Sequence, residues 1–297
     1  MNNLNSKDKS CELKEIGNSF LNSFKHEHAI EYFTKAIELD PNDAEALDLR
    51  GFAMFELLEI DKAIKDFEQA VLIDPEYHAA FAHLGEIALS RNNHEQAESY
   101  FEKALKIFPE NISYMSNLAF SKLQINKEEE SLGLCNTILK DVPSDKWALD
   151  FRGGIYLKKK KYSEALKDFL RLSEEDKNNA GIYNNIGYTY SKLGKIENAK
   201  SNLVLCINLD PEFAYAYNNL GYVHYLERKF EKALELINYS IKLDPSNSYA
   251  YKNRALVYID QNDTRSATED LKKAIELGFT REFGDEVQVL LHKYERG

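Results

Sequence analysis

The stretch Tyr183-Asn184-Asn185-Ile186-Gly187-Tyr188 returns as Tyr217-Asn218-Asn219-Leu220-Gly221-Tyr222 and again as Tyr251-Lys252-Asn253-Arg254-Ala255-Leu256. Each block begins 34 residues after the previous one. A fixed period of this length is typical of a solenoid, in which each repeat packs only against its neighbours. The sequence therefore predicts a linear array of similar units around no single central core.

The same interval extends over most of the chain, in eight rows of 34 residues without insertion or deletion. The rows are residues 10–43, 44–77, 78–111, 112–145, 146–179, 180–213, 214–247 and 248–281. Position 8 of the rows is always small: Gly17, Gly51, Gly85, Ala119, Gly153, Gly187, Gly221 and Ala255. Position 32 is proline in six rows.

Each row has room for two helices. In the first row, Leu13, Ile16 and Phe20 follow helical spacing, and Ile30 and Phe33 do so in the second half. Small residues at positions 8 and 20 let the two helix axes approach closely. Proline at position 32 ends the second helix, because it cannot continue the hydrogen-bond ladder. Each pair leaves an apolar face open, so we expect the pairs to stack.

These positions together resemble the tetratricopeptide repeat family. The resemblance implies an all-α fold, a right-handed superhelical solenoid of antiparallel helix pairs over residues 10–281. We expect residues 1–9 to be disordered. Residues 282–297 are predicted to form a C-terminal capping helix, because Val287, Leu290, Leu291 and Tyr294 have helical spacing and would cover the last apolar face.

The fourth row departs most from the others. Ser131, Cys135 and Ile138 replace its usual small, aromatic and small residues, and Leu172 and Lys177 are irregular in the fifth row. We therefore predict a less regular array, with a changed packing angle or a soft joint, near residues 138–180.

Arginine stands at position 7 of three rows, where other rows have an apolar residue: Arg50, Arg152 and Arg254. We expect a structural role for these side chains, whose stems can pack between helices while the guanidinium reaches water or a carboxylate. Asp48 and Asp150, two residues earlier, could partner a neighbouring turn.

Composition excludes several classes of function. The net charge of −11 argues against nucleic acid or an anionic membrane as the main partner. We expect a cytoplasmic protein, because the first ten residues contain no apolar run typical of a signal peptide.

The three cysteines have neither the spacing of a disulfide framework nor that of a zinc site. Without a catalytic motif, a metal motif or a phosphate-binding loop, we expect no enzyme activity, cofactor, metal or small-molecule substrate.

The resemblance also implies that the first helix of each row lines a concave surface through positions 2, 5, 6, 9, 12 and 13, here called the inner face. Position 6 is asparagine in Asn117, Asn185, Asn219 and Asn253, the last three on consecutive rows. An amide both donates and accepts, so such a ladder can pair with an extended peptide backbone. This is similar to the asparagine ladders of O-GlcNAc transferase and kinesin light chain. The alternative is that asparagine is simply common in this repeat.

Aromatic and polar side chains surround this predicted ladder. Tyrosine offers apolar area with a polar tip, which suits a binding surface, although some of these rings could instead pack against the adjacent helix. The predicted peptide-binding or protein-binding residues beside the ladder are Asn184, Tyr188, Tyr215, Asn218, Tyr222, Tyr225, Tyr249 and Lys252.

The amino-terminal half of the inner face is predicted to be acidic. Glu45, Asp48, Glu56 and Glu86 occupy its positions and would attract a basic segment. Lys14 and Asn18 resemble two members of the carboxylate clamp of co-chaperones in this family. The other clamp positions do not match, so that activity is not expected.

The sequence thus predicts a non-enzymatic adaptor that binds an extended peptide or a partner protein on its inner face. The alternative is a structural scaffold subunit, or a self-associating protein, whose inner face is permanently occupied. The identity of the partner and the oligomeric state do not follow from the sequence.

Overall fold

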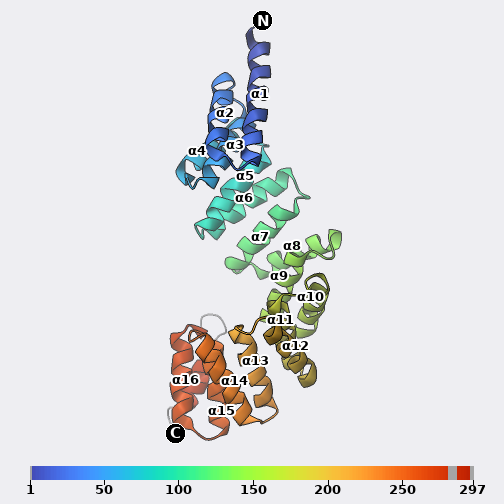
Figure 1. Cartoon of the computed structure of the whole chain (residues 1–297), viewed down its shortest axis with the longest axis vertical. Coiled ribbons are helices and arrows are strands. Elements are labelled where there is room, and N and C mark those ends of the chain that lie inside the picture. The colour runs from blue at the N-terminus through green and yellow to red at the C-terminus, as the bar shows by residue number, and fades with distance from the viewer. Residues whose placement is uncertain (1, 280–285, 295–297) are drawn as a thin grey trace. The chain divides into compact units, whose positions relative to one another are not determined.

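The computed structural model describes residues 2–279 and 286–294, and every regular element within those ranges is an α-helix. Sixteen of the helices follow one another as eight pairs (Figure 1). Their bounds are α1 (Asn2–Asn22), α2 (His26–Leu39), α3 (Ala44–Glu56), α4 (Ile60–Ile73), α5 (His78–Ser90), α6 (His94–Ile107), α7 (Ile112–Gln124), α8 (Glu128–Asp141), α9 (Lys146–Lys158), α10 (Tyr162–Glu175), α11 (Ala180–Lys192), α12 (Ile196–Leu209), α13 (Ala214–Leu226), α14 (Phe230–Leu243), α15 (Ser248–Asp260) and α16 (Thr264–Glu276). A further helix, α18, spans Glu286–Tyr294. The predicted all-α solenoid of helix pairs is confirmed.

The pairs pack in chain order. The two helices of each pair contact one another, and within each compact unit described below every second helix contacts the first helix of the next pair, as in α2 with α3 and α12 with α13. First helices of adjacent repeats also touch, in the series α1, α3, α5, α7 and in the series α11, α13, α15. The chain divides into two compact units, Met1–Pro143 and Ser144–Gly297. This division falls inside the range for which the sequence predicts a joint, whose softness stays a prediction.

In several helix pairs, contact between a glycine and an aromatic ring sets the distance between the two helices. Phe33, Phe67, Phe101 and Phe169 are completely buried, each facing the glycine at position 8 of its own repeat. A Cβ atom added to Gly51 would lie 2.8 Å from Cε1 of Phe67. Such a contact is too short for an ordinary side chain, so close packing of the two helices depends on glycine here.

The turn between the two helices has the same backbone conformation in every repeat. Position 15 has a positive φ in all eight, from Phe24 at 57° and Leu58 at 62° to Gly194 at 71°. This left-handed region is unfavourable for residues with a Cβ atom. Only one of the eight positions is glycine, so most repeats hold a strained residue at this turn.

The amino-terminal helix begins earlier than expected. The prediction that residues 1–9 are disordered is wrong for residues 2–9, which belong to α1. The hydroxyl of Ser10 is buried and donates to the carbonyl oxygen of Ala36 at 3.1 Å, and the hydroxyl of Ser6 donates to that of Leu39 at 3.1 Å. These carbonyls lie in the last turn of α2, and that of Ala36 also accepts from the backbone N–H of Asp40 at 2.9 Å. The two serine bonds attach the extra turns of α1 to the first repeat.

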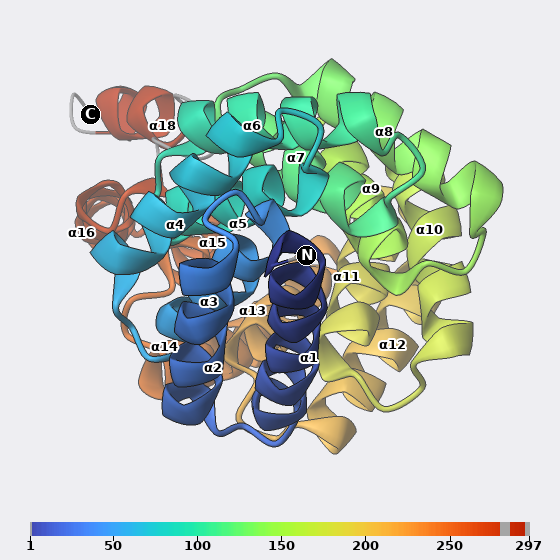
Figure 2. The same cartoon turned by 90° about the horizontal axis from the view of Figure 1, so that it is seen from above.

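The carboxyl-terminal helix α18 lies against α16 (Figure 2). Its residue Val287 is completely buried in a cluster with Leu271, Ala274 and Phe279. The apolar face of the last repeat is therefore covered by α18, as a terminal helix of a solenoid must do. Residues 282–285 and 295–297 of the predicted capping segment lie outside the described residues.

Candidate functional site

The ladder asparagines bond to one another between repeats. Nδ2 of Asn219 donates to Oδ1 of Asn184 at 2.8 Å, and Nδ2 of Asn253 donates to Oδ1 of Asn218 at 2.9 Å. In both pairs position 6 of one repeat reaches position 5 of the preceding repeat, on adjacent first helices. The amides at these positions therefore brace the array from repeat 6 to repeat 8.

This bracing corrects two of the predicted ligand contacts. Asn218 is only 1% exposed, and Asn253 is 7% exposed. A buried amide with its partner in place has little freedom to bind a second molecule. Asn218 is thus not available to a ligand, and Asn253 is held chiefly by its neighbour.

The same inter-repeat bond occurs in the first unit with different side chains. Nδ1 of His83 lies 2.8 Å from Oδ1 of Asp48, and the hydroxyl of Tyr77 donates to Oδ2 of Asp48 at 3.3 Å. Asp48 is buried, so the prediction that it forms part of an acidic partner-binding surface is wrong. Burial lowers the pKa of His83, but the bond to Asp48 outweighs burial and leaves that pKa raised.

Asn185 differs from the other ladder amides. Its Nδ2 donates no hydrogen bond within the described residues, and its Oδ1 meets only Nδ2 of Asn184, at 3.5 Å. The side chain borders a hollow of about 280 Å³ that is also lined by Trp147, Asp150 and Ile182. Within repeats 6–8, the amide of Asn185 is therefore the ladder group that has both of its N–H donors open to a ligand.

A group of lysines and tyrosines lies beside the ladder on the first helices α11, α13 and α15. Nζ of Lys192 is 4.6 Å from the ring centre of Tyr222 and 5.2 Å from that of Tyr188. Nζ of Lys252 approaches Tyr222 at 5.9 Å and lies 3.4 Å from Oε1 of Glu286 at the start of α18. We call Tyr188, Lys192, Tyr222 and Lys252 the lysine–tyrosine cluster.

Burial shifts the acid–base properties of this cluster. It lowers the pKa of Lys192 to about 8, and the nearby ammonium group of Lys252 acts in the same direction. It raises the pKa of Tyr188 to about 12. The ammonium of Lys192 is thus poorly solvated, and it gains attraction from two aromatic faces rather than from a carboxylate within ion-pair distance in the described residues.

The remaining predicted tyrosines contact other rings. Tyr215 and Tyr249 meet edge to face with ring centres 6.3 Å apart, and Tyr249 also meets Phe279 at 5.4 Å. Tyr225 lies 5.9 Å from Tyr222 and 6.2 Å from Phe230. These rings pack between neighbouring helices, and Tyr215 still exposes 42% of its surface.

The acidic residues of the first unit form no continuous surface. Oε2 of Glu45 bonds to Nζ of Lys14 at 2.6 Å, and that lysine also contacts Asp43 at 2.9 Å. Glu86 is half-buried, and burial raises its pKa. Glu56 is exposed. Glu56 and Glu86 are the acids left from the predicted set after Asp48 and Glu45 are paired.

Asn117, the ladder residue of the fourth repeat, is half-buried in the first unit, and its backbone carbonyl accepts from the Ser121 hydroxyl at 2.8 Å.

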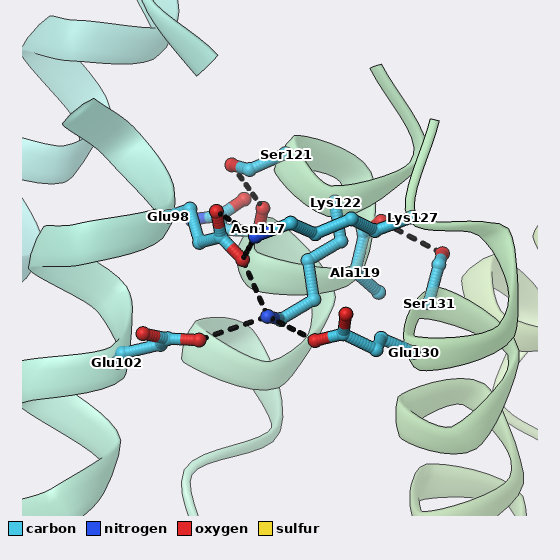
Figure 3. Close-up of polar contacts among 9 residues, drawn as sticks. All are labelled: Glu98, Glu102, Asn117, Ala119, Ser121, Lys122, Lys127, Glu130 and Ser131. Atoms are coloured by element: carbon cyan, nitrogen blue, oxygen red, sulfur yellow. Dashed lines mark hydrogen bonds and ion pairs between the residues drawn. The ribbon is translucent and has the colours of Figure 1, made fainter. Parts of the chain in front are cut away.

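An ion cluster lies between the third and fourth repeats. Nζ of Lys122 contacts Oε1 of Glu98 at 2.5 Å, Oε1 of Glu102 at 2.8 Å and Oε2 of Glu130 at 2.7 Å (Figure 3). These carboxylates belong to α6 and α8, and Lys122 belongs to α7. The cluster therefore joins repeats 3 and 4 through charge.

Ser131 makes a polar bond at a position where the other repeats have alanine. Its buried hydroxyl donates to the backbone carbonyl of Ala119 at 2.7 Å (Figure 3). The residue that looks irregular in sequence is thus accommodated by a hydrogen bond between the two helices of its own repeat.

The arginines at position 7 have partners that the sequence reading missed. Nε and Nη2 of Arg254 bond to the two carboxylate oxygens of Asp270 at 2.7 Å each. Arg50 pairs in the same two-bond geometry with Asp66. Arg152 does so with Asp168, so the carboxylate that each guanidinium reaches is the aspartate at position 23. Aspartate occurs at position 23 only in the three repeats with arginine at position 7, a coincidence that could have revealed the pairs.

The part of the chain that the structure describes has neither a metal-binding cluster nor a membrane-spanning helix. It contains no group of three or more His, Cys, Asp or Glu side chains arranged to hold a metal ion. None of the helices described is both long and apolar enough to cross a membrane.

Comparison with protein families agrees with the repeat geometry. Models described as tetratricopeptide repeat match residues 11–43, 53–112, 180–213, 214–247 and 248–277, and a model described as TPR repeat matches residues 153–194. The chain belongs to the tetratricopeptide repeat family. The matches leave out residues 113–152, which contain most of the irregular fourth repeat.

Solved structures, among them a tetratricopeptide repeat protein, have the same fold. One, from Parabacteroides merdae, is 20% identical with a TM-score of 0.69, and the match covers 85% of this chain and 98% of the other. A chain of the APC/C hetero-tetramer Cut9–Hcn1 is 16% identical with a TM-score of 0.60, covering 91% of this chain and 52% of that one. MamA from Desulfovibrio magneticus is 18% identical with a TM-score of 0.54, covering 57% and 96%. Comparison with curated protein sequences gives no match. Such low identities support the fold alone.

Proposed function

We propose that this tetratricopeptide repeat protein is an adaptor whose inner face on repeats 6–8 binds an extended segment of a partner protein. The observation that carries the proposal is the open amide of Asn185 beside a hollow, next to the half-buried ring of Tyr188 on the same helix. An amide with free donors in a row of braced amides is a suitable contact for a peptide main chain.

The bracing of the other amides supports rather than replaces this role. Asn219 is half-buried, and its bond to Asn184 uses one of its two N–H groups. Because the amide is already held in place, ordering it on binding costs little side-chain entropy. Asn185 and Asn219 would thus contact the segment's main chain, and Tyr188, Tyr222 and Tyr225 its side chains.

The two acids of the first unit that remain from the predicted set, Glu56 and Glu86, are a secondary part of the proposal. Glu56 and Glu86 would attract a basic stretch of the same partner and speed its association at low salt. Reversing both charges should lower the association rate and reduce its salt dependence. An unchanged rate would mean that these carboxylates are only solvated.

Site-specific photo-crosslinking tests the proposed binding surface. A random-peptide display library is selected on the full chain, and the chosen peptides are crosslinked from benzoylphenylalanine placed at Tyr188. The matched control places the same group at Leu205, which is exposed on the second helix α12. Crosslinks from position 188 and not from 205 support the proposal.

A second measurement uses the open amide. Asn185→Ala should weaken the selected peptides by roughly fivefold, the loss of one hydrogen bond of about 1 kcal/mol. A library that yields no binding peptide, or equal crosslinking from both positions, would contradict the proposal. Light scattering that shows a stable self-associated complex would favour the scaffold alternative.

A further inference from the structure

The ammonium group of Lys192 lacks an anionic partner of its own. It lies on the inner face of repeat 6, half-buried between the rings of Tyr188 and Tyr222. No carboxylate lies within ion-pair distance of its Nζ among the described residues. Aromatic faces and the end of helix α11 compensate part of the lost hydration, but a buried charge is normally paired as well.

The second lysine of the cluster shows what kind of group this site accepts. Lys252 is 8% exposed, and Oε1 of Glu286 lies 3.4 Å from its Nζ. Glu286 belongs to α18, a helix from beyond the last repeat, and is itself exposed. A carboxylate from outside the repeats thus already sits at one edge of the lysine–tyrosine cluster.

From these contacts we infer that the lysine–tyrosine cluster binds a carboxylate of the partner's extended segment, either an Asp or Glu side chain or a terminal carboxylate. The inference rests on the proposed function and adds the chemistry of its ligand. Lys192 supplies the charge-assisted hydrogen bond, and Tyr188 and Tyr222 supply ring edges and hydroxyl groups around it. Glu286 competes for Lys252 in the free protein.

Other ligand chemistries fit the cluster less well. A cationic side chain would meet two ammonium groups, and like charges at this separation repel. A purely apolar side chain would bury Lys192 further without supplying the missing anion. A carboxylate would pair with the poorly solvated ammonium group of Lys192. It would also repeat the kind of contact that Glu286 already makes with Lys252.

Sequencing of selected peptides tests the inference directly. The random-peptide library is selected in parallel on the full chain and on its Lys192→Gln/Lys252→Gln variant. Asp, Glu or a free carboxyl terminus should be enriched at one position of the wild-type pool, and the enrichment should be lost with the variant. Replacing that acid by its amide should weaken binding at least about tenfold.

Two single variants complete the design. Glu286→Gln should tighten acidic peptides severalfold, because Lys252 loses its internal competitor. Lys242→Gln is the matched control, since Lys242 is an exposed lysine in the last turn of α14, and it should change nothing. Circular dichroism confirms that each variant is folded.

The outcomes separate this inference from the proposed function. A pool that binds but is not enriched in acids, or equal enrichment on the double variant, would overturn the carboxylate site and leave the adaptor intact. A library without any binding peptide would instead reject the adaptor. If Lys192→Gln lowers stability and leaves acidic-peptide affinity unchanged, Lys192 is only a structural cation.

Discussion

Nδ2 of Asn253 donates to Oδ1 of Asn218 at 2.9 Å, and both amides are buried. Asn253→Ala should therefore lower the free energy of unfolding by about 1–3 kcal/mol, because it leaves a buried carbonyl oxygen unsatisfied. Chemical denaturation followed by circular dichroism measures the change. The matched control is Asn185→Ala, whose amide makes no such bond and whose stability should match the wild type.

The two asparagine variants distinguish bracing from binding. If Asn253→Ala is as stable as the wild type, the inter-repeat bond contributes nothing in solution. If Asn185→Ala is strongly destabilised instead, its amide is part of the scaffold, and the proposed contact with a peptide main chain loses its basis.

The ion cluster of Figure 3 should be sensitive to loss of its central lysine. Lys122→Met should destabilise the first unit by about 2–4 kcal/mol, because the buried carboxylate of Glu98 loses a close partner. Lys106→Met, on an exposed turn of α6, is the control and should stay within about 0.5 kcal/mol of the wild type. Equal effects of the two variants would show that the cluster adds no stability.

The cluster should also make the first unit sensitive to acid. Burial raises the pKa of Glu98, but the bonds to Lys122 and Lys127 outweigh burial and leave that pKa below its usual 4.5. A carboxyl whose pKa is lower in the folded state stabilises it at higher pH. This stability should disappear as the pH falls from the usual value through the lowered one. The Lys122→Met variant should lose less stability over the same pH range.

The strained turn at position 15 can be relieved. Leu58 has a φ of 62° and is 82% exposed, so Leu58→Gly removes strain with little loss of packing. Relief of about 1–2 kcal/mol exceeds the entropic disadvantage of glycine, about 0.5–1 kcal/mol, so the net gain should be about 0.5–1 kcal/mol. The reverse change at the same position of repeat 6, Gly194→Ala, should destabilise. A lower melting temperature for Leu58→Gly would contradict this reading.

Binding of acidic peptides should weaken as the pH rises through about 8. The pKa of Lys192 is lowered to about 8, so its ammonium group is lost above that value. Fluorescence anisotropy between pH 7 and 9.5 measures the change, and the Lys192→Gln variant should show a flat profile. The charged and titratable groups around Lys192 are Lys160, Tyr162, Tyr188, Tyr222, Lys252 and Glu286.

The stability of the free protein should change in the opposite direction over this range. The pKa of Lys192 is lower in the folded state than its ordinary 10.5, so the unfolded chain binds more protons between about 8 and 10. More protons on the unfolded chain mean that the contribution of Lys192 to stability rises with pH there. Opposite slopes for binding and stability would identify Lys192 as the titrating group.

The 34-residue period was sufficient to predict the helix pairs. Glycine at position 8, phenylalanine at position 24 and proline at position 32 each have one local physical role, and these roles repeat. The predicted disorder is wrong for residues 2–9, because a polar sequence can still form helix when Ser6 and Ser10 find carbonyl partners on α2.

The predicted binding residues depended on information that the period does not contain. Whether Asn253 points to a ligand or to Asn218 depends on the axial offset between adjacent first helices. A repeat alignment lists equivalent positions, but it does not say which positions of neighbouring repeats meet. The same limit explains why Asp48, bonded to His83, was assigned to an open acidic surface.

The arginine–aspartate pairs recur with a period longer than one repeat. Arg50, Arg152 and Arg254 lie 102 residues apart, three repeats in each step. Arg50 also reaches Thr34 at 3.3 Å and Arg254 reaches Asn238 at 2.6 Å, each on the second helix of the preceding repeat. Excision of residues 44–145, which are repeats 2–4, would make Arg152 the position 7 residue that follows Thr34. Excision of repeat 2 alone would instead put an apolar residue, Leu84, at that position. Removing a block of three repeats would therefore keep an arginine at this junction, while the Asp48–His83 bond and the Lys122 ion cluster would be lost with the excised residues.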